Sequence, residues 1–170
     1  MLLLPGSGVH VMFNALPDDA HFLSRLDEKE LLGTVSNHPI QLEDRVWPTL
    51  EHYVLAMQFE DESRQESIRM APDSVTARKL GKTGWFRRPR DNWKNLRSVY
   101  MTRAVYTKCH AYPDVAAALL ATGDDVLVEN DQYDYYWGCG RDRRGENAYG
   151  KVLMQVRARL REEKESTDAN

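Results

Sequence analysis

The spacing of hydrophobic and polar residues along the chain predicts six helices and a few short strands. Apolar residues recur at helical spacing, with capping residues at the ends, and the predicted helices are residues 48–59, 62–70, 73–81, 91–111, 113–122 and 148–163. Short apolar runs predict strands at 22–26 and 126–128, and a polar corner between apolar residues predicts a hairpin at 40–47. The pattern therefore predicts a mostly helical α+β fold.

The two ends of the chain differ from the rest. Residues 1–20 have weak periodicity, which indicates a loosely attached arm, and residues 164–170 are polar, which predicts a disordered tail. No repeat or low-complexity segment divides the region between them. A chain of 170 residues fits one domain with a substantial core, so we expect a single domain over residues 1–170.

Composition and charge exclude several classes of protein. A hydrophobic fraction of 42% with 29% charged residues is ordinary for a globular domain. The net charge of −3 argues against binding nucleic acid by bulk electrostatics. Cys109 and Cys139 form neither a disulfide framework nor a zinc motif, so two reduced thiols are expected.

The apolar start of the chain does not predict a signal peptide. Residues 1–4 lack a basic segment before them, and Pro5 and Gly6 interrupt the apolar run. No segment approaches the roughly 18 consecutive apolar residues of a membrane helix. We therefore expect a cytoplasmic protein with no membrane partner.

The first segment that could carry chemistry is residues 47–53, WPTLEHY. Glu51 falls in the first turn of a predicted helix, where the helix dipole favours an ionised carboxylate. The simpler interpretation is that Glu51 only complements the helix terminus. A structural role is also the simpler interpretation of His52, because no metal-ligand spacing lies nearby.

The second segment is residues 87–93, RRPRDNW, at the end of a basic loop over 82–90. Guanidinium groups such as that of Arg90 bind phosphate, and the indole of Trp93 offers a face on which a base can stack. Asp91 is predicted to cap the longest helix, 91–111. The alternative is a solvated basic loop with Trp93 anchored in the core.

The third segment is residues 129–140, ENDQYDYYWGCG. It combines carboxylates and aromatic side chains with two glycines, which let a backbone approach a ligand closely. The alternative is a structural loop whose aromatic side chains pack on the core. So many aromatic residues in polar surroundings favour a ligand site.

Other classes of enzyme lack their motifs in this chain. There is no GxGxxG after a strand, no GxxxxGK[ST], no HExxH and no GxSxG. A nucleophilic Cys139 would need a base, and no evident one is close in the sequence.

Taken in order, these segments resemble the NADAR family, which includes N-glycosidases of riboflavin-pathway intermediates and hydrolases of ADP-ribosylated guanine. The matching residues span about 22–161 and are Ser36, Asn37, Trp47, Pro48, Thr49, Glu51, His52, Tyr53, Ala56, Phe59, Ala77, Leu80, Gly81, Arg90, Trp93, Leu127, Val128, Glu129, Asp134, Tyr136, Trp137, Gly138, Gly140, Asn147, Gly150, Leu153 and Met154. No single block is decisive, but the ordered set is specific.

The resemblance implies a mostly helical α+β fold and hydrolysis of an N-ribosyl bond without a metal or organic cofactor. It implies Glu51, Trp93 and Asp134 as catalytic residues. The expected substrate-binding residues are Asn37, Trp47, His52, Arg90, Tyr136, Trp137, Gly138 and Asn147. The expected partner is a small nucleotide-like substrate or ADP-ribosylated guanine in nucleic acid.

This expectation agrees with the chemistry of the residues. Cleavage of a ribosyl C1–N bond passes through an oxocarbenium-like state, which a carboxylate stabilises. A second group must position water or protonate the departing base.

Two departures from the family pattern leave an alternative open. Many members carry a Lys where this chain has Gln58, and His38 and Pro39 directly follow the Ser36-Asn37 block. Gln58 motivates the second reading, a non-catalytic module that binds ADP-ribose or a nucleotide.

Overall fold

The computed structural model describes residues 16–17 and 19–169 of the chain. Most of the predicted N-terminal arm, residues 1–20, lies outside the described residues. In chain order the elements are β1 (His21–Leu23), β2 (Ile40–Leu42), β3 (Arg45–Trp47), α1 (Leu50–Met57), α2 (Glu62–Arg69), α3 (Ser74–Leu80), α4 (Trp93–Ala111), α5 (Pro113–Ala121), β4 (Leu127–Glu129) and α6 (Ala148–Asp168). The predicted mostly helical α+β fold is confirmed.

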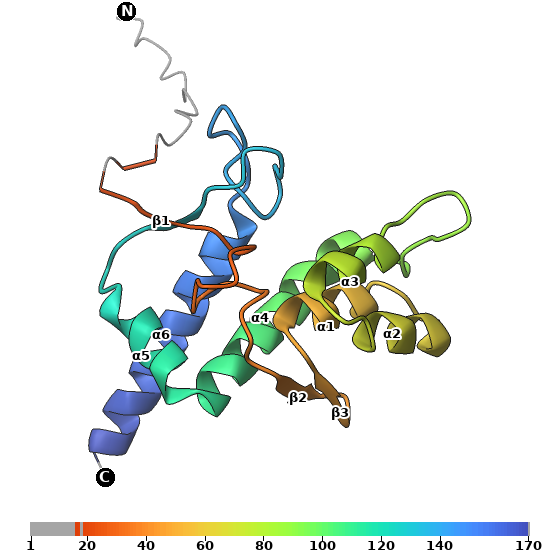
Figure 1. The fold of residues 1–170 in the computed structure, drawn as a ribbon. Helices are drawn as coiled ribbons and strands as arrows, with labels where there is room; N and C mark the ends of the chain where they lie inside the picture. Colours follow the sequence, from red (N-terminus) through yellow and green to blue (C-terminus); the bar gives the residue numbers. More distant parts are fainter. Residues whose placement is uncertain (1–15, 18, 170) are drawn as a thin grey trace, which may run out of the picture.

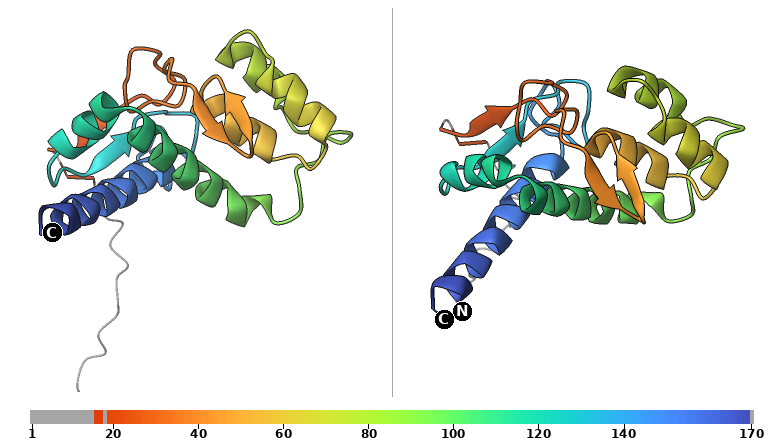
Figure 2. Two further views of the ribbon diagram at one scale, coloured as in Figure 1. Left: turned by 90° about the horizontal axis from the view of Figure 1, so that it is seen from below. Right: turned by 60° about the horizontal axis from the view of Figure 1, so that its bottom comes forward.

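Helix α4 runs through the middle of the molecule and organises the other elements around it (Figure 1). Helices α1, α2 and α3 and the β2–β3 hairpin lie toward one end of α4, and α5 and α6 pack toward the other. Figure 2 shows α6 extending away from the body of the protein toward the C-terminus. Within the described helices, none is long and apolar enough to cross a membrane.

The predicted hairpin is confirmed, and the other two strands pair over a long distance in sequence. Strands β2 and β3 are antiparallel, with Ile40 opposite Trp47. Strand β1 lies parallel to β4, with Phe22 opposite Val128. This pairing brings the chain that follows β1 close to the loop that follows β4, and both segments contribute to the site described below.

The core contains large aromatic side chains whose polar atoms are bonded inside the protein. Trp47, Tyr53 and Tyr149 are fully buried. The indole N–H of Trp47 donates to the carbonyl oxygen of Leu42 at 2.9 Å. The hydroxyl of Tyr149 donates to the carbonyl oxygen of Leu32. Such internal partners offset the loss of water that burial of a polar atom entails.

The starts of two helices test the predicted caps. Thr49 caps α1, with its side chain accepting the N–H of His52, as expected for a Thr at this position. The prediction that Asp91 caps α4 is wrong. The helix begins after Asn92, which has a left-handed φ of 63° and makes no side-chain capping bond.

The prediction of a disordered tail is also wrong, because α6 continues through Asp168 and is longer than α4. The carboxylate of Glu163 accepts hydrogen bonds from the Tyr106 hydroxyl and from Arg159, and it contacts a ring nitrogen of His110. The contacts with Tyr106 and His110 tie this part of α6 to α4, which local polarity alone could not reveal.

Candidate active site

A cavity of about 110 Å³ lies between α1, α4, the segment after β1 and the loop after β4. Its polar and aromatic lining consists of Arg25, Glu51, Gln58, Trp93, Arg97 and Trp137, and its apolar lining consists of Val54, Leu55 and Met101. Two segments that the sequence marked separately, 47–53 and 87–93, therefore meet here with the loop over 129–140.

Glu51 projects from the first turn of α1 into this cavity with one carboxylate oxygen anchored. Oε2 accepts hydrogen bonds from Nη1 of Arg25 at 3.0 Å and from Oγ1 of Thr34 at 2.7 Å. Within the described residues, Oε1 accepts no hydrogen bond. The side chain is thus held rigidly while one oxygen remains available to a water molecule or a substrate.

The segment that contains Thr34 is held by a buried lysine of α4. The ammonium of Lys108 donates to the carbonyl oxygens of Leu31 and Gly33 at 2.6 and 3.0 Å and to the Ser36 hydroxyl at 2.6 Å. Burial lowers the pKa of Lys108 to about 8. Lys108 therefore fixes the segment that orients Glu51, a contribution that no motif in the sequence indicates.

Arg25, like Arg97, lines this site although the sequence did not single it out. It lies in the segment after β1, and it donates from Nη2 to Oδ2 of Asp134 at 3.2 Å as well as to Glu51. Its backbone N–H donates to Oε2 of Glu129 at 2.5 Å. Burial acts to lower the pKa of Arg25, but the three carboxylates outweigh burial and raise it.

Asp134 organises the loop and does not line the cavity. Oδ1 accepts the backbone N–H groups of Tyr136 and Trp137 at 2.9 and 2.8 Å, while Oδ2 accepts from Arg25. Both oxygens are therefore occupied. This geometry assigns Asp134 to positioning Arg25 and Trp137 around Glu51, and its expected catalytic role remains a prediction.

Glu129 is a buried acid behind Arg25. Its side chain is 1% exposed, and burial raises its pKa to about 7, although the hydrogen bond and charge of Arg25 act in the opposite direction. Burial therefore disfavours the charged form of this carboxyl group near neutral pH.

The aromatic side chains of the site come from α4 and from the loop after β4. Trp93 is half-buried at the start of α4 and lies 5.8 Å from the ring of Tyr100. Trp137 packs against Tyr136, with ring centroids 4.7 Å apart. Trp93 and Trp137 both line the cavity, so each can offer a flat face to a base or sugar ring.

Gln58, the departure from the family pattern, lies in the cavity wall. Its amide nitrogen donates to the carbonyl oxygen of Gly81 at 2.6 Å, and its backbone oxygen accepts the N–H of Arg90 at 2.6 Å. No lysine lines this cavity in the part of the chain that the structure describes. The substitution is thus at a position that a substrate would meet.

Three predicted substrate-binding residues are buried and bonded inside the protein, and none of them lines the cavity; their contact with a substrate stays a prediction. Trp47 is 0% exposed. His52 is 1% exposed, with its ring nitrogens 2.9 Å from Thr49 Oγ1 and 3.3 Å from the Ala71 oxygen, and burial lowers its pKa. Asn147 joins β4 by accepting the N–H of Glu129 and donating to another β4 carbonyl, each at 2.9 Å.

Three further predicted residues lie outside the cavity. Arg90 donates to the Tyr100 hydroxyl and the Phe59 carbonyl oxygen, both at 2.9 Å, and faces a different surface hollow. Gly138 allows close packing within its loop, since a Cβ there would lie 2.7 Å from the Asp131 oxygen. Asn37 is exposed before β2 and does not line the cavity.

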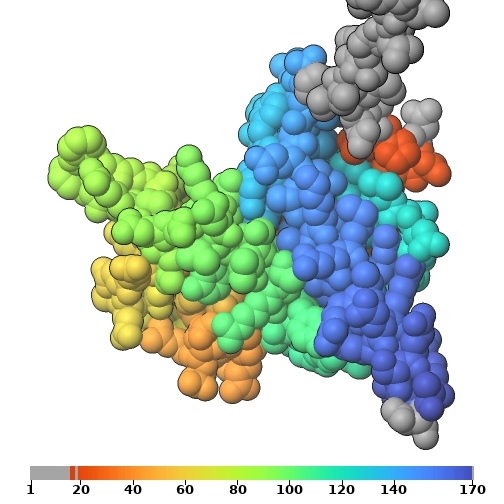
Figure 3. All heavy atoms as spheres, turned by 180° about the vertical axis from the view of Figure 1, so that it is seen from behind, coloured from red at the N-terminus to blue at the C-terminus, as the bar shows by residue number. Residues whose placement is uncertain are grey.

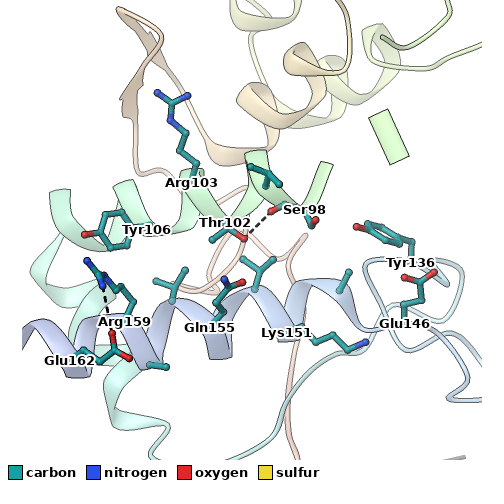
Figure 4. A pocket seen from close by; sticks show the side chains of 15 residues that line it. Ser98, Thr102, Arg103, Tyr106, Tyr136, Glu146, Lys151, Gln155, Arg159 and Glu162 are labelled. Carbon is teal, nitrogen blue, oxygen red and sulfur yellow. Dashed lines mark hydrogen bonds and ion pairs between the residues drawn. The ribbon is translucent and has the colours of Figure 1, made fainter. Parts of the chain in front are cut away.

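The last predicted residue, Tyr136, lines a second and larger hollow. This groove of about 900 Å³ runs between α4 and α6. Figure 3 shows the two helices side by side on the surface, and Figure 4 shows the side chains that line the groove. Over the residues that the structure describes, no cluster of three or more His, Cys, Asp or Glu side chains could hold a metal ion.

A model of the NADAR domain family matches residues 12–161. The chain belongs to this family. It is 33% identical over 156 residues to N-glycosidase YbiA of Escherichia coli (strain K12), covering 91% of this chain and 94% of that protein. It is 37% identical over 129 residues to N-glycosidase Npun_R5314 of Nostoc punctiforme, covering 74% of this chain and 82% of that protein.

A longer relative and a solved structure extend this similarity. The Riboflavin biosynthesis protein PYRR, chloroplastic, of Zea mays is 32% identical over 161 residues, which cover 85% of this chain and 26% of that protein. The NMR structure of E. coli YbiA superposes with a TM-score of 0.77 at 32% identity, covering 88% of this chain and 89% of that chain. The family fold therefore accounts for most of the described molecule.

Proposed function

We propose that this protein is an N-glycosidase that hydrolyses a ribosyl C1–N bond in a phosphorylated, nucleotide-like substrate. The observation that carries the proposal is Glu51, whose Oε2 is anchored by Arg25 and Thr34 while Oε1 is available in an aromatic cavity. The names of the relatives YbiA and Npun_R5314, both N-glycosidases, support the same reaction class.

The reaction follows from the charge that develops at the ribose. As the base departs, C1 becomes electron-deficient, and a fixed carboxylate close to it lowers the energy of that state. Oε1 of Glu51 is the unbonded carboxylate oxygen in the cavity, and it can also accept a proton from an attacking water molecule. The guanidinium of Arg25 donates to Oε2 and so keeps the whole carboxylate in place.

The two tryptophans supply the second part of the mechanism. Trp93 and Trp137 line the same cavity from different elements, so their ring faces can hold the substrate ring that lies beside Glu51. Holding the reactants in one geometry removes much of the entropic cost of the reaction. We place ADP-ribosylated guanine and a ribosylamino-pyrimidine phosphate in the substrate class, since both contain this bond.

A second function, a non-catalytic module that binds ADP-ribose or a nucleotide, is motivated by Gln58 in the cavity wall. One experiment separates the two. Purified protein is incubated with each substrate class, and the released base is measured by chromatography. The proposal predicts release of the free base from at least one class, whereas binding of both without release would support the module and overturn the enzyme.

A further inference from the structure

The cavity around Glu51 is too small for a whole nucleotide. Its volume is about 110 Å³, whereas sites for small molecules usually measure roughly 300–1,000 Å³. A cavity of this size accommodates a single ring. The remaining parts of the substrate must therefore lie outside it, and the groove of about 900 Å³ between α4 and α6 is large enough to receive them.

Arg97 and Tyr136 lie between the cavity and the groove. Arg97 lines the cavity, Tyr136 lines the groove, and the guanidinium carbon of Arg97 is 3.0 Å from the centroid of the Tyr136 ring. Ser98, the residue after Arg97 on α4, also lines the groove. A substrate that extends from the cavity toward the groove would thus pass this pair.

Arg97 has no anionic partner among the residues that the structure describes. Its Nε is buried without a hydrogen bond, and no carboxylate forms an ion pair with its guanidinium there. By contrast, Arg25 is bound to Glu51 and Asp134, and Arg90 donates to Tyr100 and Phe59. A half-buried guanidinium with free donors is suited to a phosphate, which it can bind in a bidentate geometry.

The pairing of the other charged residues of the groove also supports a role for Arg97. Arg103 pairs with Glu43, and Arg159 pairs with Glu162 and Glu163. Figure 4 shows Lys151 and Glu146 near Tyr136 at one end of the groove, so a cation and a carboxylate lie there together. Within the described residues neither Lys151 nor Arg97 forms an ion pair, so both leave positive charge at this end, and of the two only Arg97 also lines the cavity.

We propose that Arg97 binds the phosphate group on C5 of the ribose, between the cavity and the α4–α6 groove. This inference rests on the proposed function, because it assumes that the ribose lies beside Glu51. The guanidinium then fixes the ribose from the end opposite its bond to the base. Arg97 accordingly determines specificity for phosphorylated ribosyl substrates, and Tyr136 keeps its guanidinium in place.

The test measures binding of ribose 5-phosphate, ADP-ribose and unphosphorylated ribose by isothermal titration calorimetry. We expect Arg97→Ala to weaken the binding of ribose 5-phosphate at least about tenfold, because hydrogen bonds between charged groups are the stronger kind. Ribose binding should not change. The affinity of Arg97→Lys for ribose 5-phosphate should lie between those of the parent and Arg97→Ala, because an ammonium keeps the charge but lacks the planar fork.

Arg103→Ala is the matched control. Arg103 is the other arginine of α4, but its guanidinium binds Glu43 at the β2–β3 turn. This variant should bind ribose 5-phosphate as the parent does. The proposal would be overturned if Arg97→Ala lost affinity equally for ribose and ribose 5-phosphate. It would also be overturned if the variant lost no affinity for either phosphorylated ligand.

The two phosphorylated ligands distinguish the source of the phosphate. If Arg97→Ala loses affinity for ribose 5-phosphate alone, the ligand is a phosphate monoester. If it also loses affinity for ADP-ribose, the site binds a diphosphate as well. If Arg97→Ala does not fold, Arg97→Gln replaces it, with thermal unfolding as the check. Because these measurements need no turnover, failure to release a base would overturn the proposed function and leave the phosphate subsite standing.

Discussion

Arg25 donates a hydrogen bond to Glu51 over 3.0 Å, and both side chains are more than nine-tenths buried. This pair joins the segment after β1 to the start of α1, and it leaves one oxygen of Glu51 without a bond inside the described protein. The simpler interpretation of Glu51, a carboxylate that only complements a helix terminus, predicts an exposed side chain. The buried pair therefore favours a functional role.

Replacing Asp134 tests the assignment of this residue to positioning. Asp134→Asn keeps an oxygen that can accept the N–H groups of Tyr136 and Trp137, but it removes the charge that faces Arg25. We expect the rate of base release to fall by a smaller factor than in Glu51→Gln. Asp134→Ala should lower this rate more than Asp134→Asn does, because the loop then also loses its hydrogen bonds to Oδ1. Equal effects of Asp134→Asn and Glu51→Gln would place Asp134 in the chemical step.

Substitution of Trp93 separates a stacking residue from a core residue. Trp93 is half-buried and lines the cavity. The free energy of unfolding of Trp93→Ala should therefore fall by less than the roughly 3–5 kcal/mol expected for a fully buried Trp. Trp93→Phe should retain part of the activity, because a smaller aromatic ring still stacks. Nucleotide ligands should quench the tryptophan fluorescence of the parent, and most of that quenching should disappear in Trp93→Ala. Full quenching in the variant would contradict the assignment.

Arg90 should behave as a structural residue. Arg90→Ala removes hydrogen bonds to Tyr100 and Phe59, so the free energy of unfolding should fall by about 1–3 kcal/mol in chemical denaturation. Any change in KM should be the same for phosphorylated and unphosphorylated substrates. A larger change in KM for the phosphorylated substrates would show that the basic loop over 82–90 binds phosphate.

Glu129 gives the stability a defined dependence on pH. Its pKa is raised by burial to about 7, above its ordinary value of 4.5, so the folded protein binds a proton that the unfolded chain has released. The contribution is fully present below about pH 4.5 and is lost as the pH rises toward 7. Its size is on the order of 3 kcal/mol.

Chemical denaturation of the parent and of Glu129→Gln at several pH values measures this contribution. The parent should lose stability relative to the variant between pH 5 and 7, because glutamine does not titrate. Other groups, such as the buried His52, titrate in both proteins and cancel in the difference. A difference that stays constant with pH would show that Glu129 is not protonated in the folded protein.

The sequence predicts the helices well because their caps and periodicity are local. Thr49 and the spacing after it place α1 and therefore Glu51. The role of Arg25 depends on the parallel pairing of β1 with β4, between residues that are far apart in the chain. The same holds for Lys108, whose contacts with the segment around Thr34 join distant residues. Trp47 and His52 match the family pattern but are buried in the structure, and sequence alone does not separate burial from contact with a substrate.

The most direct test of the account is the rate of base release by Glu51→Gln at saturating substrate. The amide keeps the volume and can accept from Arg25 and Thr34, so unfolding should become easier by only about 1–3 kcal/mol. Without the carboxylate charge, the rate should fall at least about 100-fold. Ribose 5-phosphate should still bind, which shows that the site remains formed. A folded Glu51→Gln protein that releases the base at close to the parent's rate would contradict the account.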